Sequence, residues 1–186
     1  MPLRRPARAA ILALPSALLL TGCGATTLRA AIGPTIDSQG KVGVETTFGL
    51  GIGTPVDFRG RSHHFLQVMP SLGGGLDSRT HKGIFRLAGD VDYLYWASSS
   101  MDVRTGLRLS YRTIPGAPEA AGLYGVGGHL AFLPVVSGDE EGWLVRHFCI
   151  GPELQVEYLW SDPAGSSRSL ISLPLVVDLT FLGAGD

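Results

Sequence analysis

Four side chains in the second half of the chain could bind a metal ion. His147, Cys149 and Glu153 share the parity of an extended segment, so they would point to one face, and His129 lies in the preceding segment. Imidazole, thiolate and carboxylate are ligands for transition metals. In a strand, however, His147 and Cys149 would lie about 7 Å apart, which is wide for one ion. Polar residues that satisfy one another explain the four equally well, so we predict neither a metal nor a cofactor.

Two pairs of carboxylates could act as general acid and base. Asp90 and Asp92 form one pair, and Glu153 and Glu157 form the other; each pair would face one side of a strand. Arginines share these faces, so we expect the carboxylates to be counter-ions. The sequence contains no Gly-x-Ser-x-Gly turn, and no helix follows its glycine-rich stretches. We therefore predict that the protein is not an enzyme, and interpret "RSHH" (residues 61–64) as a loop leading into a strand.

Cys23 stands in the most specific sequence context of the chain. A basic segment, "MPLRRPAR", precedes an apolar stretch that is too short to span a bilayer, and this stretch ends in "LTGC", Leu20–Cys23. The segment resembles a bacterial lipobox. The resemblance implies cleavage before Cys23, diacylglycerol on its sulfur and an acyl chain such as palmitate on its new amine. Gly24, in place of an aspartate, favours sorting to the outer membrane. Ordinary cleavage after Ala25, without a lipid, is the alternative.

This leader defines the expected domain organisation. Residues 1–22 would be a lipoprotein signal peptide, and residues 23–186 a single β-barrel domain, since 186 residues suffice for one small domain. If Cys23 is acylated, Cys149 is the only free thiol, and no intramolecular disulfide can form. The formal net charge is −1, and no basic stripe is present, which argues against a nucleic-acid partner.

The rest of the sequence is a series of strand-like segments separated by turn-rich stretches. No long segment combines helical periodicity with capping residues. The expected strands are Thr27–Ile36, Lys41–Gly53, His64–Leu76, Ile84–Trp96, Val103–Thr113, Leu123–Pro134, Leu144–Trp160 and Leu170–Leu182. Even spacing and short connections predict an up-and-down meander.

Residue character alternates within these segments. In Lys41–Gly53, "KVGVETTFGLGIG", even positions carry Val, Thr, Phe, Leu and Ile, while odd positions carry Lys, Glu, Thr and four glycines. The same separation recurs in Ile84–Trp96, Val103–Thr113, Leu144–Trp160 and Leu170–Leu182. A two-residue period predicts strands with one apolar and one polar face.

Two closed barrels fit this pattern, a soluble one with its apolar face inside and an outer-membrane one with its apolar face toward lipid. Glycine on the polar face would weaken a solvated strand, but inside a narrow barrel it leaves room for long side chains. Aromatic residues near segment ends, at Tyr93, Tyr95 and Trp96 and at Tyr158 and Trp160, indicate an interfacial girdle. We therefore predict an all-β, antiparallel up-and-down barrel of about eight strands with its polar face inside.

In dyad pattern and length the mature chain resembles the small eight-stranded outer-membrane β-barrel proteins. It departs from that class at its end, "FLGAGD", where Phe181 lies five residues before the terminus. The polar face would then supply buried ion pairs, since an unpaired buried charge is costly. The expected members are Arg29, Glu45, Arg86, Asp90, Asp92, Arg104, Arg108, Arg112, Glu153, Glu157 and Asp178. Closure of the barrel would bring Arg29 and Asp178 within salt-bridge reach, directly or through a neighbour.

These features predict an outer-membrane protein, lipid-anchored at Cys23, with a structural or interaction role in the cell envelope, including a role as a subunit of a larger envelope complex. Its partners would be the lipid bilayer and other envelope proteins. One alternative is a soluble, lipid-anchored barrel that binds an apolar ligand or a protein partner. Another is an outer-membrane lipid-modifying enzyme. Lipid A deacylases are one such class, but "GGHLAF" does not match their His-x-Ser pair.

Overall fold

The computed structural model describes residues 24–56, 63–98, 100–113, 122–141, 144–161 and 167–183. The lipobox, Leu20–Cys23, lies outside these ranges, so its cleavage and lipidation stay predictions. Arg61 of the "RSHH" segment lies outside them as well. Among the described residues, no helix has the length and apolar character needed to cross a membrane.

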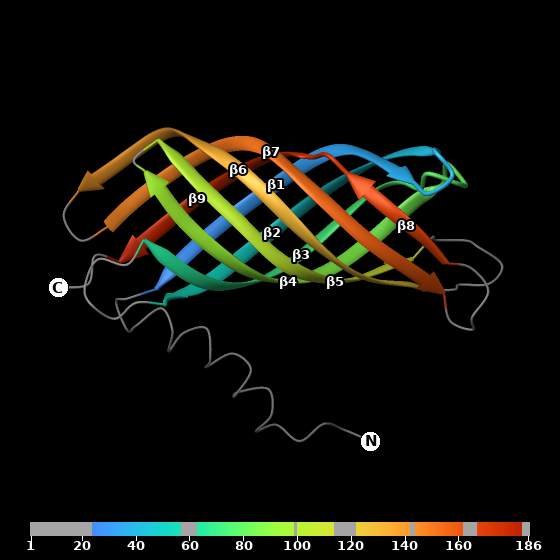
Figure 1. Ribbon diagram of the computed structural model, residues 1–186, viewed down its shortest axis with the longest axis horizontal. Coiled ribbons are helices and arrows are strands. Elements are labelled where there is room, and N and C mark those ends of the chain that lie inside the picture. The colour runs from blue at the N-terminus through green and yellow to red at the C-terminus, as the bar shows by residue number, and fades with distance from the viewer. Residues whose placement is uncertain are drawn as a thin grey trace, which may run out of the picture.

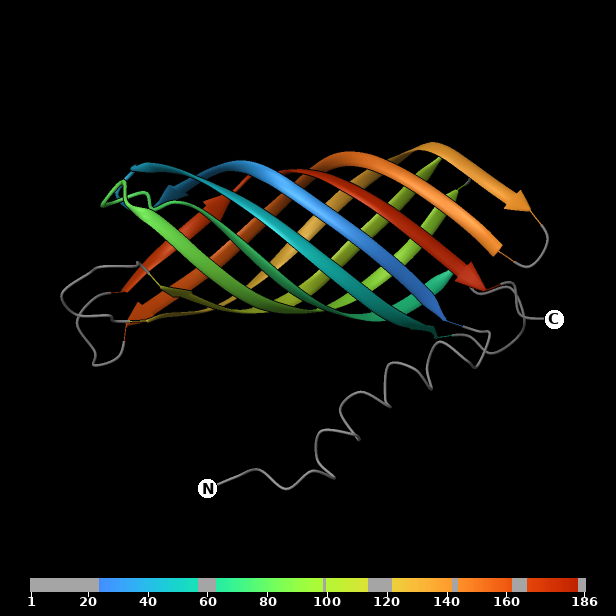
Figure 2. The ribbon, with the colours of Figure 1, turned by 180° about the vertical axis from the view of Figure 1, so that it is seen from behind.

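Nine antiparallel strands follow one another around a closed ring (Figures 1 and 2). The strands are β1 (Ala25–Asp37), β2 (Val42–Pro55), β3 (His64–Leu76), β4 (Gly83–Ser98), β5 (Met101–Thr113), β6 (Leu123–Glu141), β7 (Leu144–Ser161), β8 (Ser167–Ser172) and β9 (Leu175–Gly183). The first strand closes the ring by pairing with β2 on one side and with β8 and β9 on the other. The prediction of an antiparallel up-and-down β-barrel is confirmed.

The last position of the ring is filled by two strand segments, where the sequence predicted one strand over Leu170–Leu182. Thr35 lies opposite Ser172 in β8, and Ile32 lies opposite Leu175 in β9, so both segments keep one register against β1. Pro174 lies between them and, having no N–H, removes a donor from the ladder. Gly33 faces it closely, because a Cβ at Gly33 would lie 2.8 Å from the Pro174 nitrogen. The ring therefore has eight positions.

The sixth strand is longer than the sequence indicated. We predicted that it ends at Pro134, with a loop over "VVSGDEEG", but β6 continues to Glu141 and pairs with β7 as far as Leu144. A register shift between Val135 and Ser137 marks where this extension begins. Pairing with β5 ends at Pro134, so the hairpin projects past its neighbour (Figure 1). Cross-strand pairing thus overrides the turn-like composition of the segment.

The two ends of the barrel differ in what they carry. The turns β1–β2 and β3–β4 lie at one end, which we call the turn end, while β1 begins and β9 finishes at the other, the terminus end (Figure 2). A small apolar cluster inside the terminus end contains Ala25, Phe65 and Leu94, with Trp96 against it. Between this cluster and the turn end, the interior is mostly charged.

Candidate functional site

The wall of the barrel is apolar on the outside and charged on the inside. Arg29 is 5% exposed, whereas Leu28 and Ile32 on the same strand are 48% and 56% exposed. This is the inside-out arrangement that the glycine pattern predicted. All the residues expected in interior ion pairs are buried, namely Arg29, Glu45, Arg86, Asp90, Asp92, Arg104, Arg108, Arg112, Glu153, Glu157 and Asp178.

Nearest the turn end, two arginines and two glutamates form a closed group, which we call the Arg–Glu square. Arg86 binds Glu45 at 2.9 Å and Glu157 at 3.3 Å. Arg112 binds the same two carboxylates at 3.1 Å and 2.5 Å. These residues come from β2, β4, β5 and β7, so the square ties four strands across the interior. Two positive and two negative charges balance.

In the middle of the barrel, a second balanced group joins β1, β4, β5 and β7. Arg108 binds both oxygens of Asp90, at 2.6 Å and 2.7 Å, and lies 3.8 Å from Glu153. Glu153 also pairs with Arg29 and accepts a hydrogen bond from Gln155 at 2.6 Å. We call Arg29, Asp90, Arg108 and Glu153 the central group. In each carboxylate pair considered for acid–base chemistry, the two carboxylates therefore bind different arginines.

Toward the terminus end, Arg104 is the central cation. It binds Asp178 at 2.7 Å and lies 3.7 Å from Asp92. Asp92 also lies 3.0 Å from His129 Nε2. In the ladder, Asp92 is diagonal to Arg108, because Asp90 is the residue directly opposite Arg108 and is the one that binds it.

One carboxylate of this region was missed from the sequence. Asp102 is buried and lies 3.5 Å from His147 Nδ1, and the Cys149 thiol donates to it at 3.3 Å. Trp96 stacks on the His147 ring at a centroid distance of 4.0 Å. The signal was present, because Asp102 shares the parity of Arg104, but the predicted strand began one residue later, at Val103. We call Asp92, Asp102, Arg104, His129, His147 and Asp178 the terminal group.

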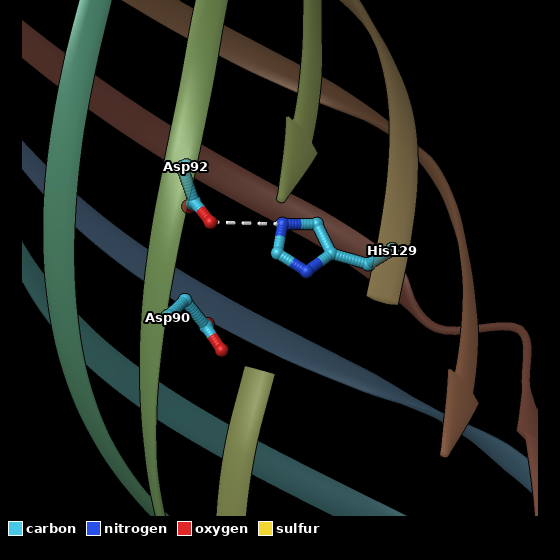
Figure 3. Close-up of side chains that lie close together, drawn as sticks. All are labelled: Asp90, Asp92 and His129. Carbon is cyan, nitrogen blue, oxygen red and sulfur yellow. Dashed lines mark ion pairs between the residues drawn. The ribbon is translucent and has the colours of Figure 1, made fainter. Parts of the chain in front are cut away.

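The four residues first considered for metal binding are not brought together. His147 and Cys149 both contact the carboxylate of Asp102, and His129 contacts that of Asp92. Glu153 belongs to the central group. A different set converges among the described residues: donor atoms of Asp90, Asp92 and His129 all lie within 4.8 Å of one another. Figure 3 shows the His129 ring reaching from β6 toward Asp92, with Asp90 on the same strand as Asp92.

The expected contact between Arg29 and Asp178 takes a different form. The two residues are direct partners in the β1–β9 ladder, and both face inward. Their charged groups nevertheless pair with other residues. The guanidinium of Arg29 binds Glu153, and the carboxylate of Asp178 binds Arg104. Long arginine side chains reach across the lumen to other strands, so adjacency in the ladder does not decide the ion pair.

A separate set of ion pairs, absent from the sequence-based list, fixes the turns. Arg79 binds Asp37 at 2.9 Å, which joins the β3–β4 turn to the end of β1, and Arg168 binds Asp77 and Ser78. Burial by itself would raise the pKa of Asp77. The hydrogen bond and charge of Arg168, with backbone N–H groups of the turn, outweigh burial and hold this pKa below its usual value.

Aromatic side chains lie on the outer wall near both ends. Tyr111, Tyr124 and Trp160 form a contiguous row near the turn end, with centroid distances of 5.3 Å and 6.2 Å. Near the terminus end, His64 stacks on Tyr95 at 4.7 Å. The assignment of Trp96 to the girdle is wrong. Trp96 shares the inward parity of Asp90 and Asp92 and packs inside against Phe65 and His147.

In the part of the barrel that the structure describes, these side chains occupy the interior. A cavity beside Arg86, Glu45 and Gln155 offers about 10 Å³, which is room for about one water molecule. Glycines allow this density. A Cβ at Gly106 would collide with the Asp92 carboxylate and lie 2.9 Å from the His129 ring. The carboxylates of these three groups lie beside arginine or histidine side chains.

One comparison with known proteins bears on the fold. No protein-family model matches the sequence, and no curated protein matches it. The crystal structure of Neisserial surface protein A, a small outer-membrane β-barrel, aligns with a TM-score of 0.51 and 11% identity, covering 86% of this chain and 96% of that one. A de novo designed transmembrane β-barrel aligns with a TM-score of 0.29 and 14% identity, over 83% and 94% of the two chains. The first likeness shows that the chain has the fold of such barrels.

Proposed function

We propose that the chain is a lipid-anchored outer-membrane β-barrel with a structural or interaction role in the cell envelope. The observation that carries this proposal is the inverted wall. Leu107 is 72% exposed in the middle of β5, while Arg104 on the same strand is completely buried. A soluble barrel would expose this apolar surface to water on every strand, whereas a bilayer covers it.

The dimensions of the wall support a membrane span. In β4, Tyr95 lies near the terminus end, and Leu87 lies opposite Tyr111 of the row near the turn end. The nine residues from Leu87 to Tyr95 are separated by eight steps, which extend about 26 Å along a strand. At a typical tilt of 35–45°, this corresponds to a height of about 20 Å, close to the apolar band of outer-membrane barrels.

The start of β1 makes the barrel and the anchor compatible. Ala25 begins β1, so Cys23 precedes the first strand by only two residues. Acyl chains on Cys23 would therefore enter the leaflet at the terminus end, next to the β1–β9 seam. We propose that this end faces the periplasm, where lipoprotein acyl chains insert.

The filled interior supports a structural or interaction role over transport. Arg–carboxylate pairs join non-adjacent strands at three levels, and the cavity beside Arg86 has room for about one water molecule. A barrel with eight ring positions has an interior just wide enough for side chains. Partners would then contact the loops, the projecting β6–β7 hairpin or the outer wall.

Electrophoretic migration tests the membrane barrel. The unheated protein in detergent should run faster than the boiled protein. A Cys23→Ser variant, which cannot be lipidated at this residue, should stay in the membrane fraction after alkaline carbonate washing. Release of that variant into the soluble fraction would favour the soluble, anchored barrel. Metabolic labelling with palmitate tests the anchor separately, because the label should be lost in Cys23→Ser and kept in Cys149→Ser. Label retained in Cys23→Ser would refute lipidation.

A further inference from the structure

The buried charges of the barrel do not balance if its histidines are neutral. Apart from the ion pairs at the turns, the described interior holds the five arginines Arg29, Arg86, Arg104, Arg108 and Arg112. It also holds the seven carboxylates Glu45, Asp90, Asp92, Asp102, Glu153, Glu157 and Asp178. Two negative charges are therefore in excess, and an uncompensated buried charge costs several kcal/mol.

The excess is confined to the terminal group. The Arg–Glu square and the central group each contain two arginines and two carboxylates. The terminal group has one arginine, Arg104, which binds Asp178 most closely. Asp92 and Asp102 remain, and each has a histidine beside it, His129 at 3.0 Å and His147 at 3.5 Å.

The surroundings of His129 favour a positive ring. Asp92 and Asp90 face it from β4, Arg104 and Arg108 lie beyond these carboxylates on β5, and Gln155 is its ladder partner on β7. Asp90 is already neutralised by Arg108. Asp92 is completely buried, and its nearest arginine, Arg104, lies at the longer distance of 3.7 Å. The ring of His129 is thus the nearest positive charge available to Asp92.

The surroundings of His147 also favour a positively charged ring. Asp102 on β5 accepts from the Cys149 thiol and lies beside His147 Nδ1, while Thr180 on β9 and Gly138 on β6 are its ladder partners. Trp96 on β4 stacks against the ring with an interplanar angle of 21°. An aromatic face attracts a cation, so the stack favours the charged ring.

A bound metal ion is the competing way to neutralise the excess. Asp90, Asp92 and His129 are close enough for one ion, but Arg108 holds both oxygens of Asp90, and Arg104 lies beside Asp92. Only two donors would then remain, in a site flanked by two guanidinium groups. A proton needs no such coordination.

We propose that His129 and His147 are both imidazolium cations in the folded barrel at neutral pH and serve as the counter-ions of Asp92 and Asp102. The terminus-end half of the barrel is then charge-balanced only while both rings hold their second proton. Alkaline pH leaves two uncompensated carboxylates inside and weakens that half, whereas the Arg–Glu square is unaffected. The barrel interior thus acts as a two-proton site that couples pH to stability.

Nitrogen-15 NMR of the imidazole rings tests the proposal directly. The full protein, labelled at its histidines and held in detergent micelles at pH 7.5, should show two protonated nitrogens for both rings. An unperturbed histidine is about nine-tenths neutral at this pH. His129→Gln and His147→Gln assign the signals, and His81, exposed in the β3–β4 turn, is the reference. A neutral ring at either buried position overturns the proposal.

Zinc titration of the same sample separates protons from metal. Addition of equimolar Zn²⁺ should leave the His129 and His147 signals unchanged. Stoichiometric zinc binding that shifts the His129 signals, and that is lost in Asp92→Asn, would overturn the proposal in favour of a metal site.

The pH dependence of unfolding supplies a third measurement. If the folded state holds two protons that the unfolded chain releases above pH 6.5, stability falls as pH rises through that range. The folding equilibrium constant should then decrease by up to about tenfold per pH unit for each histidine. The double variant His129→Gln/His147→Gln should lose this slope, and the matched His81→Gln should keep it. An unchanged slope in the folded double variant overturns the proposal.

Discussion

Arg86 and Arg112 lie directly opposite each other in the β4–β5 ladder, and both bind the same two glutamates, Glu45 and Glu157. Like charges in facing positions destabilise a sheet unless something separates them. Here the two carboxylates, reaching in from β2 and β7, alternate with the guanidinium groups. The square therefore converts a repulsive cross-strand pair into a link among four strands.

Removal of one carboxylate should expose that repulsion. Glu157→Gln leaves two buried arginines with one glutamate, and we expect a loss of about 3–5 kcal/mol in the free energy of unfolding. The double variant Arg112→Met/Glu157→Gln restores the charge balance and should cost less than the sum of its single variants. Denaturant unfolding in detergent micelles measures both. Additive effects would show that the square is not energetically coupled.

Two mid-strand glycines provide a test of interior packing. A Cβ at Gly106 would lie 2.6 Å from the Val91 carbonyl oxygen and against Asp92, whereas a Cβ at Gly89 meets nothing within 4 Å. Gly106→Ala should therefore destabilise the barrel by about 1–3 kcal/mol. Gly89→Ala should be neutral or stabilise it by up to about 1 kcal/mol. Equal effects in thermal unfolding would contradict the placement of Gly106 at a crowded interior position.

Lysine substitutions on the outer wall distinguish lipid from water. Leu107 lies at the middle of β5 and Val42 at the start of β2, and both are exposed on the outside. In a bilayer, Leu107→Lys should cost about 2–4 kcal/mol, and Val42→Lys about 0–1 kcal/mol, because the penalty depends on depth. Unfolding in phospholipid vesicles measures the difference. A soluble barrel would tolerate both substitutions equally.

The turn end should weaken in acid. The pKa of Asp77 is held below its ordinary value of about 3.9, so its ionised form stabilises the folded turn above that pH. This contribution is lost as pH falls below about 4, through the lower pKa of the folded state. The protection factors for amide hydrogen exchange at Arg79 and Thr80, whose N–H groups bind Asp77, should fall over that range. Asp77→Asn should show lower protection factors at these amides already at pH 6, with little further change in acid.

The fold was predictable because a period of two is a local property. Glu45 between Val44 and Thr46, or Arg104 between Val103 and Thr105, is visible in a few letters of sequence. Strand ends were less predictable. The extension of β6 to Glu141 depends on its pairing with β7, and the interruption at Pro174 depends on Gly33 in a strand far away in the sequence.

The sequence also predicted which charged residues lie inside the barrel, but it did not predict which of them form ion pairs with each other. Parity places Arg29 and Asp178 inside, yet an arginine side chain spans the lumen and selects partners on distant strands, as Arg29 does with Glu153. Asp102 was missed for a local reason, because the predicted strand began one residue too late, at Val103. Side-chain packing across a narrow barrel is a three-dimensional property that no single strand specifies.

The seam between β1 and β9 joins the beginning of the chain to its end. Each other strand pairs with a neighbour in sequence, so hairpins can form in succession, but the lumen stays open until the last strand arrives. The guanidinium and carboxylate groups are buried only inside the closed ring, so their dehydration depends on the β1–β9 seam as well as on the hairpins. A break in this one seam would therefore return water to the whole network at once.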